Sequence, residues 1–392
     1  MINILRKIIK PKYDTLNHIE IDAEKIIANY NYLKSLQEEA EIFPVLKSNA
    51  YGHGLKEICT ILNYTSAKMV AVDSYPEAQI VYRYFKGKVL ILGEMPLGAY
   101  RYAKLKKTEF VVYNEETLRH LSRYKKRARI HLFINTGMNR EGIKNIGKFI
   151  HENKKYLDKV DITGLCSHFV AADSRSLMNS SQEDIFMKSL DKLRSAGYFP
   201  RWVHIGNSAA IFWNDNRLLT AFRPGIASYG YNPLNTPDDA TVALQPALEV
   251  FSQVVSIQDV VSGDTVSYGG DYRVKNSGQI AIIPFGYFEG LDRRLSNTAQ
   301  FLVQANENFL AKIAGIVCMN MTCLDVDKEN IQIGDEVQIV SNKKDDVNSV
   351  ENISALMDTI SYEFLAKLQA NIKKIIINLP NNKKSKKNLK ND

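Results

Sequence analysis

The sequence predicts an α/β protein with an N-terminal (β/α)8 barrel of the TIM type and a C-terminal mainly-β domain. Between about residues 40 and 230, eight short apolar runs alternate with longer segments of helical spacing. After about residue 245, strand-like runs continue with few helical segments between them. The 392 residues are 45% apolar and 24% charged, which is a globular composition with enough length for about two domains.

The first region contains the eight predicted strands. They are EIFPVLK (from 41), KMVAVDS (68), KVLILG (88), EFVVY (109), RIHLFIN (129), DITGLCSHF (161), WVHIGN (202) and LLTAFRPGI (218). Helix-like segments such as LKEICTILNY and SSQEDIFMKSLDKL lie between them, which favours parallel strands joined by helical crossovers. Eight units in about 190 residues suggest a compact barrel. A doubly wound open sheet produces the same alternation, and periodicity alone does not separate the two.

The second region predicts a β domain. Its strand candidates are ALEVFSQVVSIQDV, TVSYGG, GQIAIIPFG, FLAKIAGIVCM, TCLDV, DEVQIVS and IKKIIINL, with one helical segment at 351–369. The early strand HIEID (18–22) can pair into this later sheet. We therefore predict a basic N-terminal extension at 1–17, a barrel at 18–245 whose first strand joins the other domain, a β domain at 246–379 and a basic disordered tail at 380–392.

The net charge of +8 comes from the two ends of the chain. Residues 1–12 carry four positive charges, and residues 380–392 carry five lysines against one aspartate. We expect these ends to be solvated, with no nucleic-acid or membrane partner. No apolar run approaches the roughly 20 residues of a membrane span, and the first residues lack a secretory pattern, so we expect a cytoplasmic protein. The four cysteines lack metal-ligand spacing, so no metal is expected.

Polar residues follow the predicted barrel strands at their carboxyl ends, where barrels place their active sites. They are Lys47, Arg140, His168, Asn207, Ser208, Arg223 and Gly225. The serine and the glycine turn after the last two strands match the place where barrels bind phosphate groups. A desolvated lysine beside them is what covalent binding of an aldehyde cofactor requires, but lysines at strand ends are also common as ion-paired residues. The neighbouring residues must decide.

Those neighbours resemble a known family. VLKSNAYGHG (45–54) is similar to the cofactor-lysine signature of alanine racemases, which are pyridoxal 5'-phosphate enzymes built from a barrel and a β domain. Eight further motifs resemble the family in order: NTGMNREGI (135–143), CSHFVAAD (166–173), HIGNSAA (204–210), FRPGIASYGY (222–231), VSYGGDY (266–272), PFGYFEG (284–290), VCMNMTCLDV (317–326) and ISYE (360–363). The resemblance implies a homodimer with shared active sites that interconverts L- and D-alanine and supplies D-alanine for peptidoglycan.

The resemblance also implies roles in catalysis. Lys47 would bind the cofactor and act as the base on one face of the substrate, and Tyr268 of the partner subunit would act on the other face. The His168 and Arg223 positions form a hydrogen-bonded chain to that tyrosine in the family. Arg223 would also meet the pyridine nitrogen, to which a guanidinium gives no proton. We infer a weaker electron sink, which disfavours side reactions such as transamination.

The remaining site residues follow from the same resemblance. The cofactor would be held by Lys47, Tyr51, His168, Asn207, Ser208, Arg223, Gly225, Ile226 and Tyr362. The substrate would meet Arg140, Met319, Asn320 and Tyr287, the last three from the partner subunit.

Several positions depart from the family pattern. Phe133 stands where many members have a lysine, often carbamylated, and Asn135 is neutral where Asp is common, so Arg140 needs a bound anion or another carboxylate. Asn320 replaces the usual Asp, and Ile316 the usual Arg. These changes leave open a racemase of the same fold with broader preference, for serine or lysine.

Two other classes of function remain as alternatives. An amino-acid decarboxylase of related architecture would normally place a carboxylate against the pyridine nitrogen, and Arg223 argues against it. A non-enzymatic pyridoxal-phosphate carrier resembles the barrel alone, and the second domain with Tyr268 argues against that.

Overall fold

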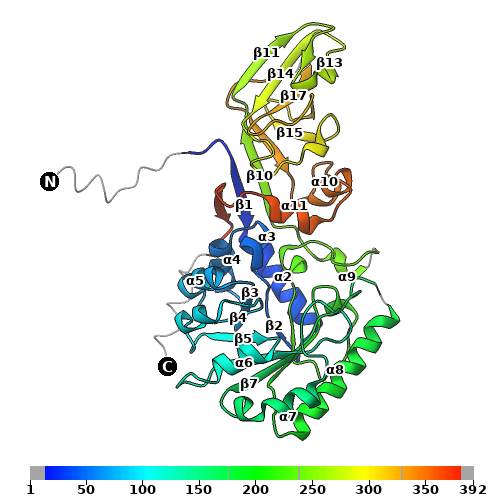
Figure 1. The fold of residues 1–392 in the computed structure, drawn as a ribbon. Coiled ribbons are helices and arrows are strands. Elements are labelled where there is room, and N and C mark those ends of the chain that lie inside the picture. Colours follow the sequence, from blue (N-terminus) through cyan, green and yellow to red (C-terminus); the bar gives the residue numbers. More distant parts are fainter. Residues whose placement is uncertain (1–13, 175, 237–238, 328–329, 381–392) are drawn as a thin grey trace, which may run out of the picture. The chain divides into compact units, whose positions relative to one another are not determined.

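The computed structural model describes residues 14–174, 176–236, 239–327 and 330–380 (Figure 1). The predicted basic extension and tail therefore fall almost entirely outside the described residues. The chain divides into two compact units. One contains residues 21–247 and 376–380, and the other contains residues 14–20 and 248–375.

The first unit is built on parallel strands. Six of them form one sheet in chain order, β3 (Met69–Val72), β4 (Lys88–Ile91), β5 (Thr108–Val112), β6 (Arg129–Phe133), β7 (Asp161–Cys166) and β8 (Trp202–His204). The short strands β2 (Glu41–Ile42) and β9 (Ala221–Phe222) pair in parallel with each other. A parallel bridge from Val45 to Ala71 joins β2 to β3, and a hydrogen bond from Thr220 N to Val203 O (2.9 Å) joins β9 to β8.

These links close the strands into a ring, so the barrel prediction is confirmed and the open doubly wound sheet is excluded. Each predicted strand is found. The barrel interior is filled by apolar side chains from every strand: Phe43, Val45, Met69, Ala71, Leu90, Val111, Phe133, Cys166, Trp202 and Ala221. The barrel is therefore packed, and chemistry is restricted to the strand ends.

Helices connect most of the strands. They are α2 (Ala23–Leu36), α3 (Lys47–Tyr51), α4 (Leu55–Leu62), α5 (Tyr75–Tyr84), α6 (Glu115–Leu121), α7 (Ile146–Leu157), α8 (Leu177–Ser195) and α9 (Asp239–Val242). Side-chain caps start several of them, as the Asn114 side chain does by accepting from Thr117 N at α6. The 3-10 segments η1 (Leu97–Tyr102), η2 (Ala210–Phe212) and η3 (Ile226–Tyr229) replace longer helices elsewhere.

The second unit is built on a nine-stranded sheet in the order β11-β14-β17-β16-β15-β18-β10-β1-β19. Its strands are β1 (His18–Asp22), β10 (Leu248–Gln253), β11 (Ser256–Val260), β14 (Gly278–Ile283), β15 (Gln300–Gln304), β16 (Phe309–Ile313), β17 (Thr322–Asp327), β18 (Glu336–Val340) and β19 (Lys373–Ile377). The early strand β1 lies between β10 and β19. A separate pair, β12 (Thr265–Val266) and β13 (Tyr272–Arg273), carries the segment that includes Tyr268.

The second unit differs from the sequence expectation in four places. Strands β13 and β15 were not predicted. The single helical segment at 351–369 is two helices, α10 (Val350–Leu356) and α11 (Ser361–Lys367), because Asp358 adopts a left-handed conformation (φ 50°) that ends the first. Within TVSYGG, only Thr265 and Val266 are strand, and Tyr268–Gly270 forms the 3-10 turn η4. No helix among the described residues is both long and apolar enough to cross a membrane.

Candidate active site

Lys47 begins an unusual turn at the end of β2. The four residues after it, Ser48 to Tyr51, all have φ between 52° and 56°. L-residues avoid this left-handed conformation because Cβ crowds the backbone, and the cost is roughly 1–2 kcal/mol per residue. Backbone hydrogen bonds from Leu46 N to Ala71 O (2.7 Å) and from Ala50 N to Leu46 O (2.9 Å) hold the turn in place.

Glu77 of α5 provides a further anchor for this turn. One carboxylate oxygen accepts from Ser48 N (2.7 Å), and the other accepts from Asp73 N (2.9 Å) and Ser74 N (3.2 Å). The same side chain thus caps α5 and fixes the residue after Lys47. Backbone strain that the surroundings stabilise in this way is typical of functional sites.

Tyr51, Ser208 and Gly225 form a compact polar cradle. A Cβ at position 225 would lie 2.3 Å from the Tyr51 hydroxyl, so the hydroxyl reaches the backbone there only because residue 225 is glycine. The Ser208 hydroxyl accepts hydrogen bonds from Gly225 N (2.8 Å) and Ala227 N (3.3 Å), whereas Ile226 N donates to no described residue. Burial raises the pKa of Tyr51 to about 12, so its hydroxyl remains a hydrogen-bond donor at neutral pH.

Four basic side chains from different strand ends gather at one mouth of the barrel. The pKa of His168 is lowered to about 3, first by burial and then by the positive charges of Arg223, Arg140 and Lys47. The charges of these three side chains act on the imidazole, which is neutral at neutral pH. The Lys47 amine forms no hydrogen bond or ion pair with any described residue. The mouth combines a free amine with two guanidinium groups and is suited to an anionic ligand.

Arg223 is buried and almost fully hydrogen-bonded. Its Nη1 donates to His204 Nδ1 and to His204 O (2.9 Å), and its Nη2 donates to Ser167 O (2.5 Å). Its Nε–H donates to no described residue. The resemblance implies a link from Arg223 to His168, but the guanidinium turns to His204 and Ser167, and the His168 ring bonds to no described residue.

Arg140 pairs with the residue that follows it. Its Nε lies 2.5 Å from Glu141 Oε2 and its Nη2 lies 2.7 Å from Glu141 Oε1. The sequence predicts that Arg140 needs a bound anion or another carboxylate, and Glu141 is that carboxylate. Phe133 packs in the barrel interior, and Asn135 accepts from the backbone of its own loop. Asn207 is likewise a loop residue, whose Oδ1 accepts from Ala209 N and Ala210 N.

The other predicted residues lie in the second unit. Tyr287 N donates to Cys318 O (3.0 Å), and the Asn320 amide donates to Glu289 Oε1 (3.0 Å), so these loops bring Tyr287, Met319 and Asn320 together. The Ser267 hydroxyl, next to Tyr268 in the sequence, donates to the Ile316 carbonyl (2.6 Å). This bond ties the segment of Tyr268 to the segment that leads to Met319 and Asn320.

Most of these side chains are exposed: Tyr268 by 69%, Met319 by 55% and Tyr287 by 43%. Tyr362 is half-buried on α11. This unit therefore presents a group of partly apolar, accessible side chains.

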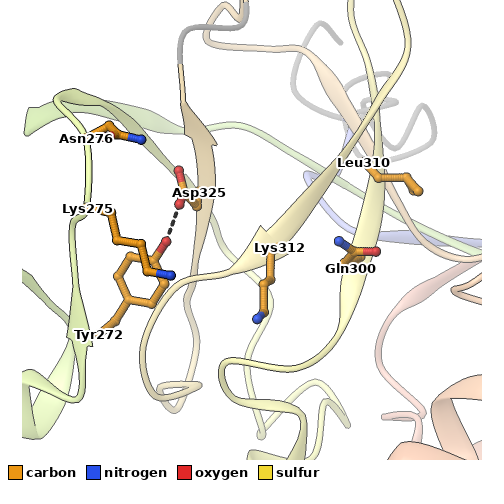
Figure 2. A pocket seen from close by; sticks show the side chains of 7 residues that line it. All are labelled: Tyr272, Lys275, Asn276, Gln300, Leu310, Lys312 and Asp325. Carbon is orange, nitrogen blue, oxygen red and sulfur yellow. Dashed lines mark hydrogen bonds between the residues drawn. The ribbon is translucent and has the colours of Figure 1, made fainter.

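The second unit also contains a hollow of about 270 Å³ with a different set of lining residues (Figure 2). It is lined by Tyr272, Lys275, Asn276, Gln300, Leu310, Lys312 and Asp325. The Tyr272 hydroxyl donates to the Asp325 carboxylate across it. None of the predicted site residues lines this hollow, so the strand ends of the barrel remain the candidate active site.

Comparison with known proteins decides the family. The family description "Alanine racemase, N-terminal domain" matches residues 21–233, and "Alanine racemase, C-terminal domain" matches residues 247–376. The chain belongs to the alanine racemase family. Alanine racemase 1 of Clostridium acetobutylicum is 30% identical over 368 residues, which cover 91% of this chain and 94% of that protein. The alanine racemase of Borreliella burgdorferi is 31% identical over 363 residues, which cover 89% and 94%.

Solved alanine racemases have the same fold. That of Clostridium difficile 630 superposes with a TM-score of 0.85 at 28% identity and covers 93% of this chain and 97% of its own. The alanine racemase of Bacillus anthracis with bound L-Ala-P superposes with a TM-score of 0.83 at 26% identity, over 94% and 96% of the chains. The family resemblance read from the motifs is thus confirmed.

Sequence reasoning did not identify some residues of this alanine racemase-like site. Glu141 lies within the motif NTGMNREGI, and a carboxylate beside the arginine was the signal that could have found it. His204 opens HIGNSAA, but nothing in the sequence shows that it meets Arg223.

Proposed function

We propose that this protein interconverts L- and D-alanine with pyridoxal 5'-phosphate bound at the mouth of the barrel. The carrying observation is that Lys47, Arg140, His168 and Arg223 all follow the carboxyl ends of barrel strands, where Tyr51, Ser208 and Gly225 form a polar cradle. Family membership supports the same reaction, because the curated relatives named above are alanine racemases.

The residues present fit the cofactor. The Tyr51 hydroxyl, the Ser208 hydroxyl and the backbone N–H of Ile226 provide neutral donors for a phosphate group, and Gly225 contributes the space that the Tyr51 hydroxyl occupies. Lys47, without a partner among the described residues, would bind the aldehyde carbon, and the Arg223 Nε–H would face the pyridine nitrogen. When bound, pyridoxal phosphate withdraws electrons from the substrate Cα and makes its proton removable.

The protein's residues then move that proton. Lys47 Nζ removes it from, or returns it to, one face of Cα, and the Tyr268 hydroxyl of the partner subunit serves the opposite face. Arg140, with its charge partly balanced by Glu141, orients the substrate carboxylate. Arg223 keeps its proton and limits the electron withdrawal to what a brief proton transfer needs.

A homodimer follows from the same proposal. Tyr268 is 69% exposed, and Tyr287, Phe288, Met319 and Met321 of the same unit are 43–55% exposed. Large exposed aromatic and apolar side chains that gather together are typical of protein interfaces. We propose that this surface meets the barrel mouth of a second copy, in the cytoplasm, and that the product serves peptidoglycan synthesis.

The test is chiral chromatography of the products. The purified protein with pyridoxal phosphate is given L-alanine, L-serine, L-lysine and L-glutamate separately, with Lys47→Ala as the control for contaminating racemase. We expect D-alanine to dominate and the control to form none. Stronger turnover of serine or lysine would replace the alanine assignment by a broader-specificity racemase. No racemisation by cofactor-loaded protein would overturn the proposal.

A further inference from the structure

A chain of buried hydrogen bonds runs through the barrel behind Arg223. His204 Nε2 lies 2.7 Å from His131 Nδ1, and His131 Nε2 lies 2.9 Å from Glu109 Oε2. The chain crosses from β8 through β6 to β5. Glu109 is 1% exposed, both imidazoles are 0% exposed and Arg223 is 6% exposed. The reaction proposed above uses Arg223 but does not use Glu109, His131 or His204.

The chemistry of the end groups permits a single arrangement of protons. Arg223 has only donors, so His204 Nδ1 must accept from it, and His204 Nε2 must then carry the hydrogen. That hydrogen is donated to His131 Nδ1, which leaves the His131 hydrogen on Nε2, donated to Glu109. Every bond in the chain is satisfied when both imidazoles are neutral and Glu109 is ionised.

The electrostatics agree with this arrangement. Burial lowers the pKa of His131, and burial together with Arg223 lowers the pKa of His204 well below its usual value. Burial opposes ionisation of Glu109, but hydrogen bonds from His131, Lys88 and Thr163 outweigh it and lower its pKa. The buried ends of the chain are therefore a guanidinium cation and a carboxylate anion, joined by two neutral rings.

A buried cation needs a compensating charge or hydrogen bonds. The other titratable groups that face Arg223 are His168, Cys166 and Tyr113, and none of them is an acid that ionises at neutral pH. Glu109 is the carboxylate to which the Arg223 guanidinium connects through hydrogen bonds.

We propose that Glu109, His131 and His204 are positioning residues for Arg223, which fix the orientation of its guanidinium against the cofactor ring through this hydrogen-bonded chain. This inference rests on the proposed function. The inference predicts a change in transamination, the side reaction that a stronger electron sink favours. Without an ionised Glu109, His131 no longer has to carry its hydrogen on Nε2, so His204 Nδ1 is no longer fixed as the acceptor of Arg223. A guanidinium that moves away from the pyridine nitrogen leaves that nitrogen open to a proton from solvent, and the electron withdrawal becomes stronger.

In that side reaction, the amino group of alanine passes to the cofactor, pyruvate is released, and the cofactor aldehyde becomes an amine, so no external oxidant is needed. The measured quantity is pyruvate formed per racemisation event. Glu109→Gln keeps an acceptor for His131 and removes the charge. We expect this ratio to rise about tenfold in Glu109→Gln, the change that about 1.4 kcal/mol of lost interaction with Arg223 produces.

Two further variants separate electrostatics from structure. Lys88 lies 2.8 Å from Glu109 and partly neutralises it, so Lys88→Gln should leave the ratio unchanged or lower it. Glu115→Gln removes an exposed ion pair with Arg119 and should have no effect. A rise of the ratio in both Glu109→Gln and Lys88→Gln would indicate loosened packing only and would overturn the proposal, as would no rise in Glu109→Gln.

A second readout needs neither cofactor nor activity. Two-bond ¹H–¹⁵N spectra of histidine-labelled apoprotein, assigned with His131→Gln and His204→Gln, report which ring nitrogen carries hydrogen. We expect both His131 and His204 to carry it on Nε2 alone at pH 7. A hydrogen on Nδ1 of either ring would break the chain and overturn the inference, even if Glu109→Gln does not fold. A protein that shows the expected ring states but no racemisation would contradict only the proposed function.

Discussion

The guanidinium of Arg140 is held in a two-point contact by the carboxylate of the adjacent residue, Glu141. In the family pattern that the motifs resemble, a lysine, often carbamylated, commonly stands at the place of Phe133. Here the charge partner comes from the loop that carries the arginine, and it needs no reaction with carbon dioxide. The pair raises the pKa of Arg140, first through its hydrogen bond to Glu141, so the guanidinium remains charged.

Glu141→Gln should therefore weaken the positioning of the substrate carboxylate. Because Arg140 is 58% exposed, solvent screens the pair, and we expect KM for L-alanine to rise about two- to fivefold with kcat nearly unchanged. Steady-state kinetics measure this, with Glu152→Gln, an exposed carboxylate on α7, as the control. Added bicarbonate should not change the wild-type rate. A bicarbonate-dependent rate would contradict this role of Glu141.

Lys47→Ala should abolish both the visible absorbance of the bound cofactor and racemisation, because no other amine with this placement is found at the described barrel mouth. Absorbance spectra and chiral chromatography on the same preparation measure the two effects. Retention of colour together with activity would remove Lys47 from the mechanism.

Tyr268→Phe keeps the ring and removes the phenol. We expect exchange of the Cα hydrogen with solvent deuterium to fall roughly 100-fold or more for one enantiomer of alanine and much less for the other. Mass spectrometry of each enantiomer incubated in D₂O measures this difference. Equal losses for both enantiomers would contradict the assignment of the two bases to opposite faces.

Mixing the inactive Lys47→Ala and Tyr268→Phe proteins should restore activity if each site uses both subunits. Random exchange makes half of the dimers mixed, and one of the two sites in each is intact, so about a quarter of wild-type activity is expected. The assay follows activity during mild denaturation and refolding of the mixture. Each variant refolded alone is the control, and a mixture that stays inactive despite verified exchange argues against shared sites.

Gly225→Ala should weaken cofactor binding without unfolding the barrel. The new Cβ would lie 2.3 Å from the Tyr51 hydroxyl at the end of its side chain, so the hydroxyl moves and one donor to the phosphate is lost. A hydrogen bond to a charged group contributes about 1.5–3 kcal/mol, which corresponds to at least about tenfold in the Kd of pyridoxal phosphate. Fluorescence titration measures the Kd. Gly98→Ala, where a Cβ meets nothing within 4 Å, is the control.

The stability of the apoprotein should fall as the pH is lowered from about 6.5. Burial lowers the pKa of His168 to about 3, and the pKa values of His131 and His204 are lowered too. Because the unfolded chain binds these protons first, each histidine adds up to about 1.4 kcal/mol of destabilisation per pH unit below 6.5. Urea unfolding at pH 7.5, 6.5 and 5.5 measures the slope. His168→Gln should reduce it, and an unchanged slope would contradict the burial of a neutral His168.

Much of the barrel could be predicted because its strands are short apolar runs set between helices of clear periodicity. Helix α2 was not predicted. Its buried face includes Asn29, whose side chain exchanges two hydrogen bonds with the backbone of Gln245. This polar residue interrupts the apolar pattern of the helix. Strand β15 begins and ends in glutamine, so its apolar core is only three residues long.

The candidate site likewise has one part that the sequence predicts and another part that it does not. Lys47 and Ser208 stand at strand ends, where topology alone predicts chemistry. The contacts of Arg223 depend on packing between strands that lie far apart in sequence, since His131 and His204 are 73 positions apart. Periodicity and local motifs do not contain that information.

The left-handed turn after Lys47 has a consequence for transplanting this site into another barrel. Its backbone depends on a carboxylate 29 positions further along the chain, on a different helix. Copying VLKSNAYGHG alone would move the lysine and leave its support behind. The smallest portable module is the stretch from Val45 to Glu77, which contains the lysine, its turn and the helix start that holds the turn in shape.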